Sequence, residues 1–119
     1  PGIYSARLAK KYGSFTKASK KIIELVKIKN KNKKIKNTKA KFICSLTLRI
    51  SGTKKITTTG IVEGNISEKI LGDKGFGYDP IFIPKGIKST FGQMSKRKKI
   101  LMDHRFIAFQ KLKLKFNIL

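Results

Sequence analysis

The clearest hydrophobic pattern in the chain is the alternation between residues 42 and 50. Apolar side chains occupy every second position, at Phe42, Cys44, Leu46, Leu48 and Ile50. Successive side chains of a strand point to opposite faces, so this alternation predicts a half-buried strand. A turn at Ser51-Gly52-Thr53 and a β-branched run from Lys55 to Ser67 follow. Together they predict an antiparallel hairpin, with a bend where Gly60 and Gly64 flank Glu63.

Two other stretches show the 3.6-residue period of a helix. From Ser14, apolar positions recur at Phe15, Ala18, Ile22, Leu25 and Val26, and lysines fill the opposite face. Either Ser14 or Thr16 is suited to cap this helix at its N-terminus. A second helix is predicted from His104 to about Phe116, capped by Asp103, with inward positions at Ile107, Ala108, Leu112 and Leu114. Its first turn then carries His104 and Arg105, and positive charge there is unfavourable because it opposes the helix dipole. A polar or anionic group opposite these side chains would compensate for this cost. The alternative is a histidine without a role.

The remaining segments are predicted to be connections. Between Lys27 and Lys41 only Ile28, Ile35 and Ala40 are apolar, which predicts a mobile, solvated connector. Its alternative is a nucleic-acid patch, which is disfavoured because no aromatic residue lies there to stack a base. Pro1 to Arg7 is turn-like at first and then small and polar, and we expect that it is not a stable element by itself.

Glycines, aromatic residues and a carboxylate are densest in Gly72-Asp-Lys-Gly-Phe-Gly-Tyr-Asp-Pro-Ile-Phe82. We interpret this stretch as a third strand that ends at Ile83-Pro84 and carries a binding site. In an extended segment Phe76 and Tyr78 share one face, while Gly77 and Asp79 share the other. An aromatic face beside a carboxylate suits a purine. The alternative is an edge strand with a bulge.

After this stretch the pattern predicts a loop at Gly86, a short turn at Thr90 to Met94 and a basic run at Lys96 to Lys99. Asp79 precedes Pro80, which favours an extended backbone and so directs the carboxylate.

The formal net charge is +23, from 29 basic and 6 acidic residues. Such a chain attracts polyanions, so nucleotides and nucleic acids are the candidate partners. Only four of the basic residues are arginines, at Arg7, Arg49, Arg97 and Arg105. A lysine excess of this kind commonly reflects coding bias, so the charge alone carries little functional weight.

Cys44 is the only cysteine, which excludes an internal disulfide framework and a cysteine metal site. The sequence has no apolar run near the ~20 residues of a membrane span and no apolar signal-peptide core, so we expect a cytoplasmic location and no membrane partner. The chain begins at Pro1, which indicates either processing or a piece of a longer protein.

Three blocks of the sequence together resemble the noncanonical purine nucleoside triphosphate pyrophosphatases, the inosine/xanthosine triphosphatase family. The blocks are Pro1-Gly-Ile-Tyr-Ser-Ala-Arg7, Gly75-Phe-Gly-Tyr-Asp-Pro-Ile-Phe82, and Lys99 followed by His104-Arg105. The resemblance implies an α/β fold with a mixed twisted β-sheet flanked by helices. It also implies a homodimer and Mg²⁺-dependent hydrolysis of ITP, dITP or XTP to monophosphate and pyrophosphate.

The resemblance also implies roles for particular residues. Phe76 would stack on the base, Asp79 would read its edge, and Gly77 and Tyr78 would line the pocket. The remaining substrate-binding positions carry basic side chains: Lys99 would contact the phosphate or sugar, and His104 and Arg105 would hydrogen-bond the 6-oxo group. Ser5 and Arg7 would lie near the pocket or the subunit contact. Two donors facing O6 accept hypoxanthine but oppose the amino group of adenine, which leaves a polar group unpaired.

The sequence departs from the family pattern in two respects. Asp103 stands where the family usually has a serine before His-Arg. The family's metal-binding glutamate and catalytic carboxylate segment would precede Pro1, so residues 1–119 are interpreted as a single domain that is the C-terminal portion of the enzyme. We therefore assign no catalytic and no metal residue here, and expect the chain alone to be inactive. The rival interpretations are a small basic RNA-binding module and a decayed remnant without function.

Overall fold

The computed structural model describes residues 4–118, and the chain divides into two compact units. The first unit comprises Pro1–Ala40 and Gly64–Met94, and the second comprises Lys41–Glu63 and Ser95–Leu119. Within the described residues the sheet has the strand order β1-β2-β3. The α/β class expected from the sequence is confirmed. None of the described helices is long and apolar enough to cross a membrane.

Strands β1 (Lys39–Arg49) and β2 (Lys55–Ile66) form the predicted antiparallel hairpin. Hydroxyl pairs cross its exposed face, with Ser45 Oγ 3.1 Å from Thr59 Oγ1 and Thr47 Oγ1 2.8 Å from Thr57 Oγ1. The opposite face is half-buried at alternate positions of β1, namely Phe42, Cys44 and Leu46. The amphipathic strand is thus confirmed, although Leu48 and Ile50 near the turn are exposed.

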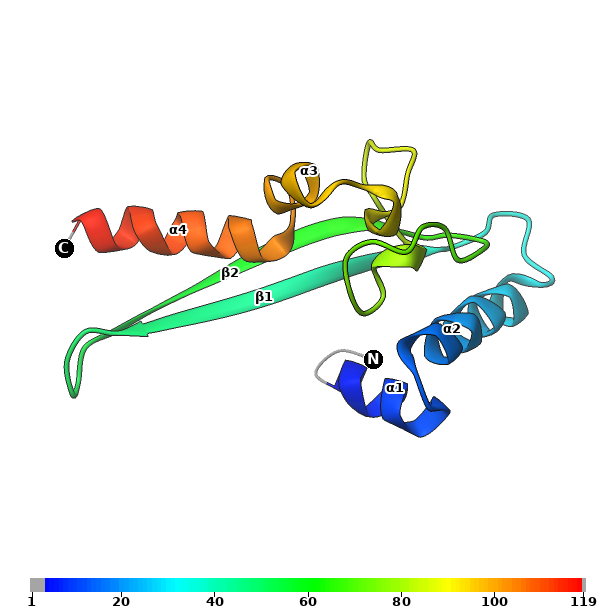
Figure 1. The fold of residues 1–119 in the computed structure, drawn as a ribbon, viewed down its shortest axis with the longest axis horizontal. Helices are drawn as coiled ribbons and strands as arrows, with labels where there is room; N and C mark the ends of the chain where they lie inside the picture. Colours follow the sequence, from blue (N-terminus) through cyan, green and yellow to red (C-terminus); the bar gives the residue numbers. More distant parts are fainter. Residues whose placement is uncertain (1–3, 119) are drawn as a thin grey trace. The chain divides into compact units, whose positions relative to one another are not determined.

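Helix α4 (His104–Ile118) packs against this hairpin within the second unit (Figure 1). Asp103 caps the helix as predicted, because its Oδ1 accepts a hydrogen bond of 2.8 Å from Phe106 N. Ala108 is fully buried, whereas Leu114 is 64% exposed and does not face inward. The two glycines of β2 mark close backbone contacts: a Cβ at Gly60 would lie 2.0 Å from His104 O, and one at Gly64 would lie 2.2 Å from Ile83 O.

Helices α1 (Ser5–Tyr12) and α2 (Phe15–Asn30) pack on each other in the first unit. Ser14 caps α2, with its Oγ accepting a 3.1 Å hydrogen bond from Lys17 N. The stretch expected to be unstable by itself is helical from Ser5, where α1 begins; Pro1, Gly2 and Ile3 lie outside the described residues. An eight-residue helix is marginal alone, so packing on α2 accounts for it.

The Lys27–Lys41 segment is shorter as a connection than predicted, because α2 continues to Asn30 and β1 begins at Lys39. Residues 31–37 are exposed, as a solvated connector requires. The Asn30 side chain links the two ends of this connector: Asn30 Nδ2 donates to Asn37 O at 2.8 Å, and Asn30 Oδ1 accepts from Asn37 N at 3.0 Å. The buried Asn30 amide is therefore the local reason that the chain turns back here.

The prediction of an extended third strand across Gly72–Phe82 is wrong. Strand β3 comprises only Phe82–Pro84 and pairs antiparallel with the end of β2, with Ile66 opposite Phe82. The stretch before it bends at three glycines with positive φ, namely Gly72 (89°), Gly75 (74°) and Gly77 (61°), and then forms a 3₁₀ turn at Asp79–Ile81. The left-handed backbone at these glycines turns the chain, so it does not continue as a strand.

The core of the first unit lies beside this stretch. The rings of Phe82 and Phe91 are stacked, with centroids 5.4 Å apart, and both are fully buried with Ile81. Phe91 belongs to a 3₁₀ turn, Phe91–Gln93, which confirms the turn predicted at Thr90 to Met94. The basic run that follows forms the short helix α3 (Lys96–Ile100) in the second unit.

Candidate functional site

The glycine-rich loop before β3 is closed by the carboxylate of Asp79. Asp79 Oδ2 accepts a hydrogen bond of 2.9 Å from Phe76 N, and Asp79 is only 3% exposed. A Cβ at Gly75 would lie 2.1 Å from the same oxygen, so the carboxylate fits only against a glycine. Asp79 therefore shapes the loop that carries Phe76, whatever else it contacts.

The two aromatic residues of the loop have different environments. Phe76 is 54% exposed. Tyr78 is half-buried. Its hydroxyl donates to Ser5 O at 2.7 Å, and its ring contacts the Phe15 ring edge-on, with centroids 5.2 Å apart. Burial raises the pKa of the Tyr78 phenol above its ordinary value of 10.0. The expectation that an extended backbone aligns Phe76 and Tyr78 on one face is therefore corrected: the intervening Gly77 has φ 61°.

The N-terminal candidates also lie in the first unit. Ser5 is brought to the loop, since its backbone oxygen receives the Tyr78 hydroxyl. Arg7 is exposed, and its guanidinium carbon lies 5.1 Å from the centre of the Tyr4 ring. This geometry is that of a cation–π contact within α1 and its preceding residue.

The second unit carries the basic candidates Lys99, His104 and Arg105. Lys99 is 6% exposed at the end of α3, which is unusual for a lysine. His104 and Arg105 open α4, where His104 is half-buried and Arg105 is exposed. The His104 ring is held beside the Phe42 ring, with centroids 5.2 Å apart and an interplanar angle of 58°.

The structure thus gathers the predicted residues into two groups, one in each unit. Ser5, Gly77, Tyr78 and Asp79 meet around the glycine loop, and Lys99, His104 and Arg105 belong to the α3–α4 region. Sequence reasoning missed Phe15 and Phe42 as supports of these groups. Phe15 and Phe42 were identified only as apolar positions of a helix and a strand, and such a pattern does not say which polar residue they will contact.

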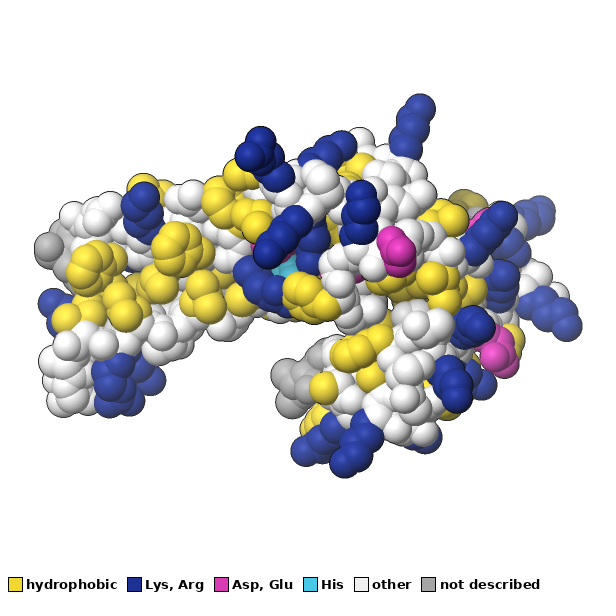
Figure 2. Space-filling view, in the orientation of Figure 1, with side chains coloured by type: hydrophobic (Ala, Val, Ile, Leu, Met, Phe, Trp, Pro, Cys, Tyr) yellow, Lys and Arg dark blue, Asp and Glu magenta, His cyan; other side chains and the backbone are white. Residues whose placement is uncertain are grey.

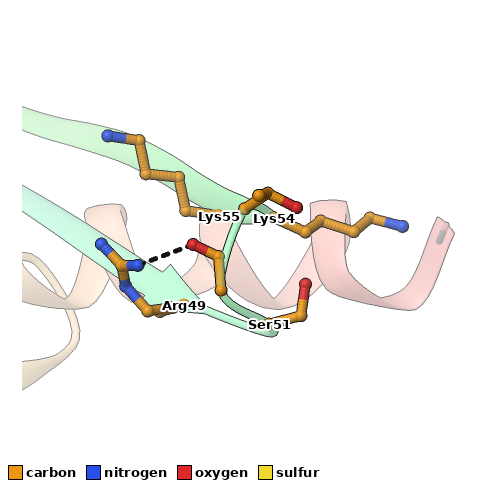
Figure 3. Close-up of a pocket in the computed structure, with 6 residues that line it drawn as sticks. Arg49, Ser51, Lys54 and Lys55 are labelled. Atoms are coloured by element: carbon orange, nitrogen blue, oxygen red, sulfur yellow. Dashed lines mark hydrogen bonds between the residues drawn. The ribbon is translucent and has the colours of Figure 1, made fainter.

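A cavity of about 170 Å³ lies at the β1–β2 turn and contains none of the predicted site residues. It is lined by polar and basic residues of the turn, namely Arg49, Ser51, Gly52, Thr53, Lys54 and Lys55. Arg49 Nη1 donates to Gly52 O at 2.9 Å (Figure 3). Lys54 extends away from Arg49 in this view, so the cationic groups do not converge on one point. Basic side chains are also spread widely over the face shown in Figure 2, which fits the high net charge rather than a single basic groove.

Comparisons with known proteins agree over most of the chain. A model of the Ham1 family matches residues 1–115. The dITP/XTP pyrophosphatase of Clostridium tetani is 39% identical over 117 residues, which cover 98% of this chain and 55% of that protein. The dITP/XTP pyrophosphatase of Dictyoglomus thermophilum is 44% identical over 114 residues, which cover 95% of this chain and 53% of that protein. The chain therefore spans about half the length of the curated relatives it matches.

Solved structures show the same likeness. A HAM1 protein from Coxiella burnetii matches with a TM-score of 0.86 and 26% identity, covering 100% of this chain and 59% of that one. The Ham1 protein of Staphylococcus aureus matches with a TM-score of 0.76 and 32% identity, covering 98% of this chain and 58% of that one.

Proposed function

Because the chain belongs to the Ham1 family, we propose that it supplies base recognition to an enzyme that hydrolyses ITP, dITP or XTP to monophosphate and pyrophosphate. The name of the matched relatives, dITP/XTP pyrophosphatase, supports this substrate class. The proposal includes a homodimer, a cytoplasmic location and the interpretation of residues 1–119 as one portion of a larger pyrophosphatase domain.

The observation that carries the proposal is that Phe76 is 54% exposed on a loop closed by the Asp79 carboxylate. Large aromatic side chains are costly to leave in water, and here 54% of Phe76 is exposed. The Asp79 carboxylate accepts a hydrogen bond from Phe76 N and lies against Gly75, so it fixes the backbone that carries this side chain. A purine stacked on Phe76 would cover this apolar surface.

Selectivity would come from the second group of residues. In the proposal, His104 and Arg105 donate hydrogen bonds to the 6-oxo group of hypoxanthine or xanthine, and Lys99 meets the phosphate or sugar. Burial of Lys99 at 6% exposure supports a positioned ammonium group rather than a solvated one. Adenine would present its amino group to the same donors, which leaves buried donors unpaired and disfavours ATP.

The family implies Mg²⁺, so we tested whether the residues of this chain fit that ion. Magnesium prefers carboxylate oxygens together with substrate phosphates. Within residues 4–118, no group of three or more His, Cys, Asp or Glu side chains is gathered. We therefore place no magnesium ligand on these residues and derive no step through the metal, and Mg²⁺ dependence stays part of the proposal.

The experiment that tests the proposal is a titration of the purified chain with ITP and with ATP at low and at high salt. We expect preferential binding of ITP that persists at high salt, because stacking and hydrogen bonding to the base are weakly screened. Binding to phosphates alone should fall steeply with salt. Single-stranded RNA serves as competitor. Equal binding of ITP and ATP, with loss of both at high salt and full competition by RNA, would favour the basic RNA-binding alternative instead.

A further inference from the structure

The N-terminal part of α4 packs against hairpin residues that have no proposed contact with the substrate. A Cβ at Gly60 would lie 2.0 Å from His104 O and 2.5 Å from Ala108 N. The helix backbone thus lies directly on β2 at this point, in the space that any side chain would occupy. The Phe42 ring of β1 meets the His104 ring from the same hairpin.

Two hydrogen bonds fix the position of the helix along the strand. Thr58 Oγ1 donates to Ala108 O at 2.7 Å, and Thr58 is only 5% exposed. At the next residue of β2, Thr59 O accepts a hydrogen bond of 3.0 Å from Lys111 Nζ of α4. Sliding or rotation of α4 would break the buried hydrogen bond and leave the Thr58 hydroxyl unsatisfied, which a buried polar group resists.

We propose that Thr58 and Gly60 are positioning residues that place the His104 imidazole, with Phe42 as the surface against which its ring rests. Through His104 they set the preference for a 6-oxo purine over a 6-amino purine. This inference rests on the base-reading role of His104 given above. Thr58 and Gly60 would not touch the nucleotide, and their effect would reach His104 through the backbone of α4 between His104 and Ala108.

The chain offers a matched control for this inference. Thr57 lies next to Thr58 but projects to the exposed face, where its hydroxyl pairs with that of Thr47 at 2.8 Å. Thr57→Val and Thr58→Val therefore remove the same hydroxyl from adjacent positions of one strand. Only the second removes a contact to α4. Thr58→Ser keeps the donor and tests rescue.

His104 is the only histidine of the chain, so its imidazole proton resonances in an NMR spectrum are unambiguous. The neighbouring Phe42 ring makes those resonances sensitive to small movements of α4. We would record them for the wild type and the three threonine variants of the 119-residue chain, and titrate each with ITP and ATP. Circular dichroism checks that each variant is folded, and Gly60→Ala serves as a second, larger displacement of α4.

We expect Thr58→Val to shift the His104 resonances and to lower the preference for ITP over ATP by about fivefold, the ratio that one ordinary hydrogen bond provides. Thr57→Val and Thr58→Ser should resemble the wild type. Unshifted His104 resonances in folded Thr58→Val and Gly60→Ala would overturn the inference, as would a lost preference without any shift. Shifted resonances with an unchanged preference would support the positioning of His104 and overturn its role in reading the base.

Discussion

Substitution of Phe76 by alanine separates ligand binding from folding at the glycine loop. Phe76 is 54% exposed and contributes its backbone N–H, rather than its ring, to the hydrogen bond with Asp79. Alanine preserves that backbone donor. The hydrogen bond that closes the loop should therefore remain, while the change removes the aromatic surface that a base would stack on.

The magnitudes follow from these contacts. Stacking of a base on an aromatic side chain contributes about 1–3 kcal/mol, so Phe76→Ala should weaken ITP binding by roughly 5- to 150-fold. A change at an exposed position should alter the free energy of unfolding by no more than about 0.5 kcal/mol. Tyr78→Ala should do the reverse. It removes the hydrogen bond to Ser5 O and the edge-on contact with Phe15, together about 2 kcal/mol of stability, with a smaller effect on affinity.

The assays are isothermal titration with ITP and urea denaturation followed by circular dichroism, applied to both variants. Tyr78→Phe is the intermediate control, because it removes the hydroxyl and keeps the ring contact with Phe15. Equal losses of affinity in Phe76→Ala and Tyr78→Ala, or a larger loss in Tyr78→Ala at matched folded fraction, would show that Phe76 is not the stacking ring.

Arg105→Lys keeps the charge but loses the planar fork of donors, so the ITP-to-ATP affinity ratio should fall; an unchanged ratio in competitive titration would remove Arg105 from base reading. Burial raises the Tyr78 pKa above 10.0, so the contribution of the protonated phenol to stability is present below pH 10 and is lost as the pH rises through the folded-state pKa. Urea titrations above pH 10 should show a steeper loss of stability in the wild type than in Tyr78→Phe, and parallel curves would contradict this. Cleavage between two phosphates needs a metal and a base that positions water, and we assign neither a metal ligand nor a catalytic carboxylate to this chain. Residues 1–119 alone should therefore release no pyrophosphate from ITP with Mg²⁺, and the full-length Clostridium tetani relative serves as positive control. Turnover by the chain would place the catalytic carboxylates among its six acidic residues.

Local pattern was sufficient for much of this fold. The alternation from Phe42 predicted β1, because one face of a strand must be apolar to be buried. The turn at Ser51-Gly52-Thr53 and the β-branched run from Lys55 to Ser67 predicted its hairpin partner β2. Asp103, and Ser14 as one of two candidate caps beside Thr16, predicted where α4 and α2 begin, because a cap satisfies a backbone donor within three residues of itself. The family likeness was also present in the sequence, since it rests on residue types at fixed spacing around Gly75–Phe82 and Lys99–Arg105.

Only the tertiary structure decided the geometry of the candidate site. A glycine allows both signs of φ, so the sequence around Gly75 and Gly77 was equally consistent with a strand and with the observed turns. The choice depends on contacts distant in the chain: Tyr78 reaches Ser5, and Gly92 packs against Pro80. The same holds for His104, whose place depends on Thr58 and Gly60 of β2. Contacts between residues so far apart in sequence arise only when the chain packs, so no local pattern records them.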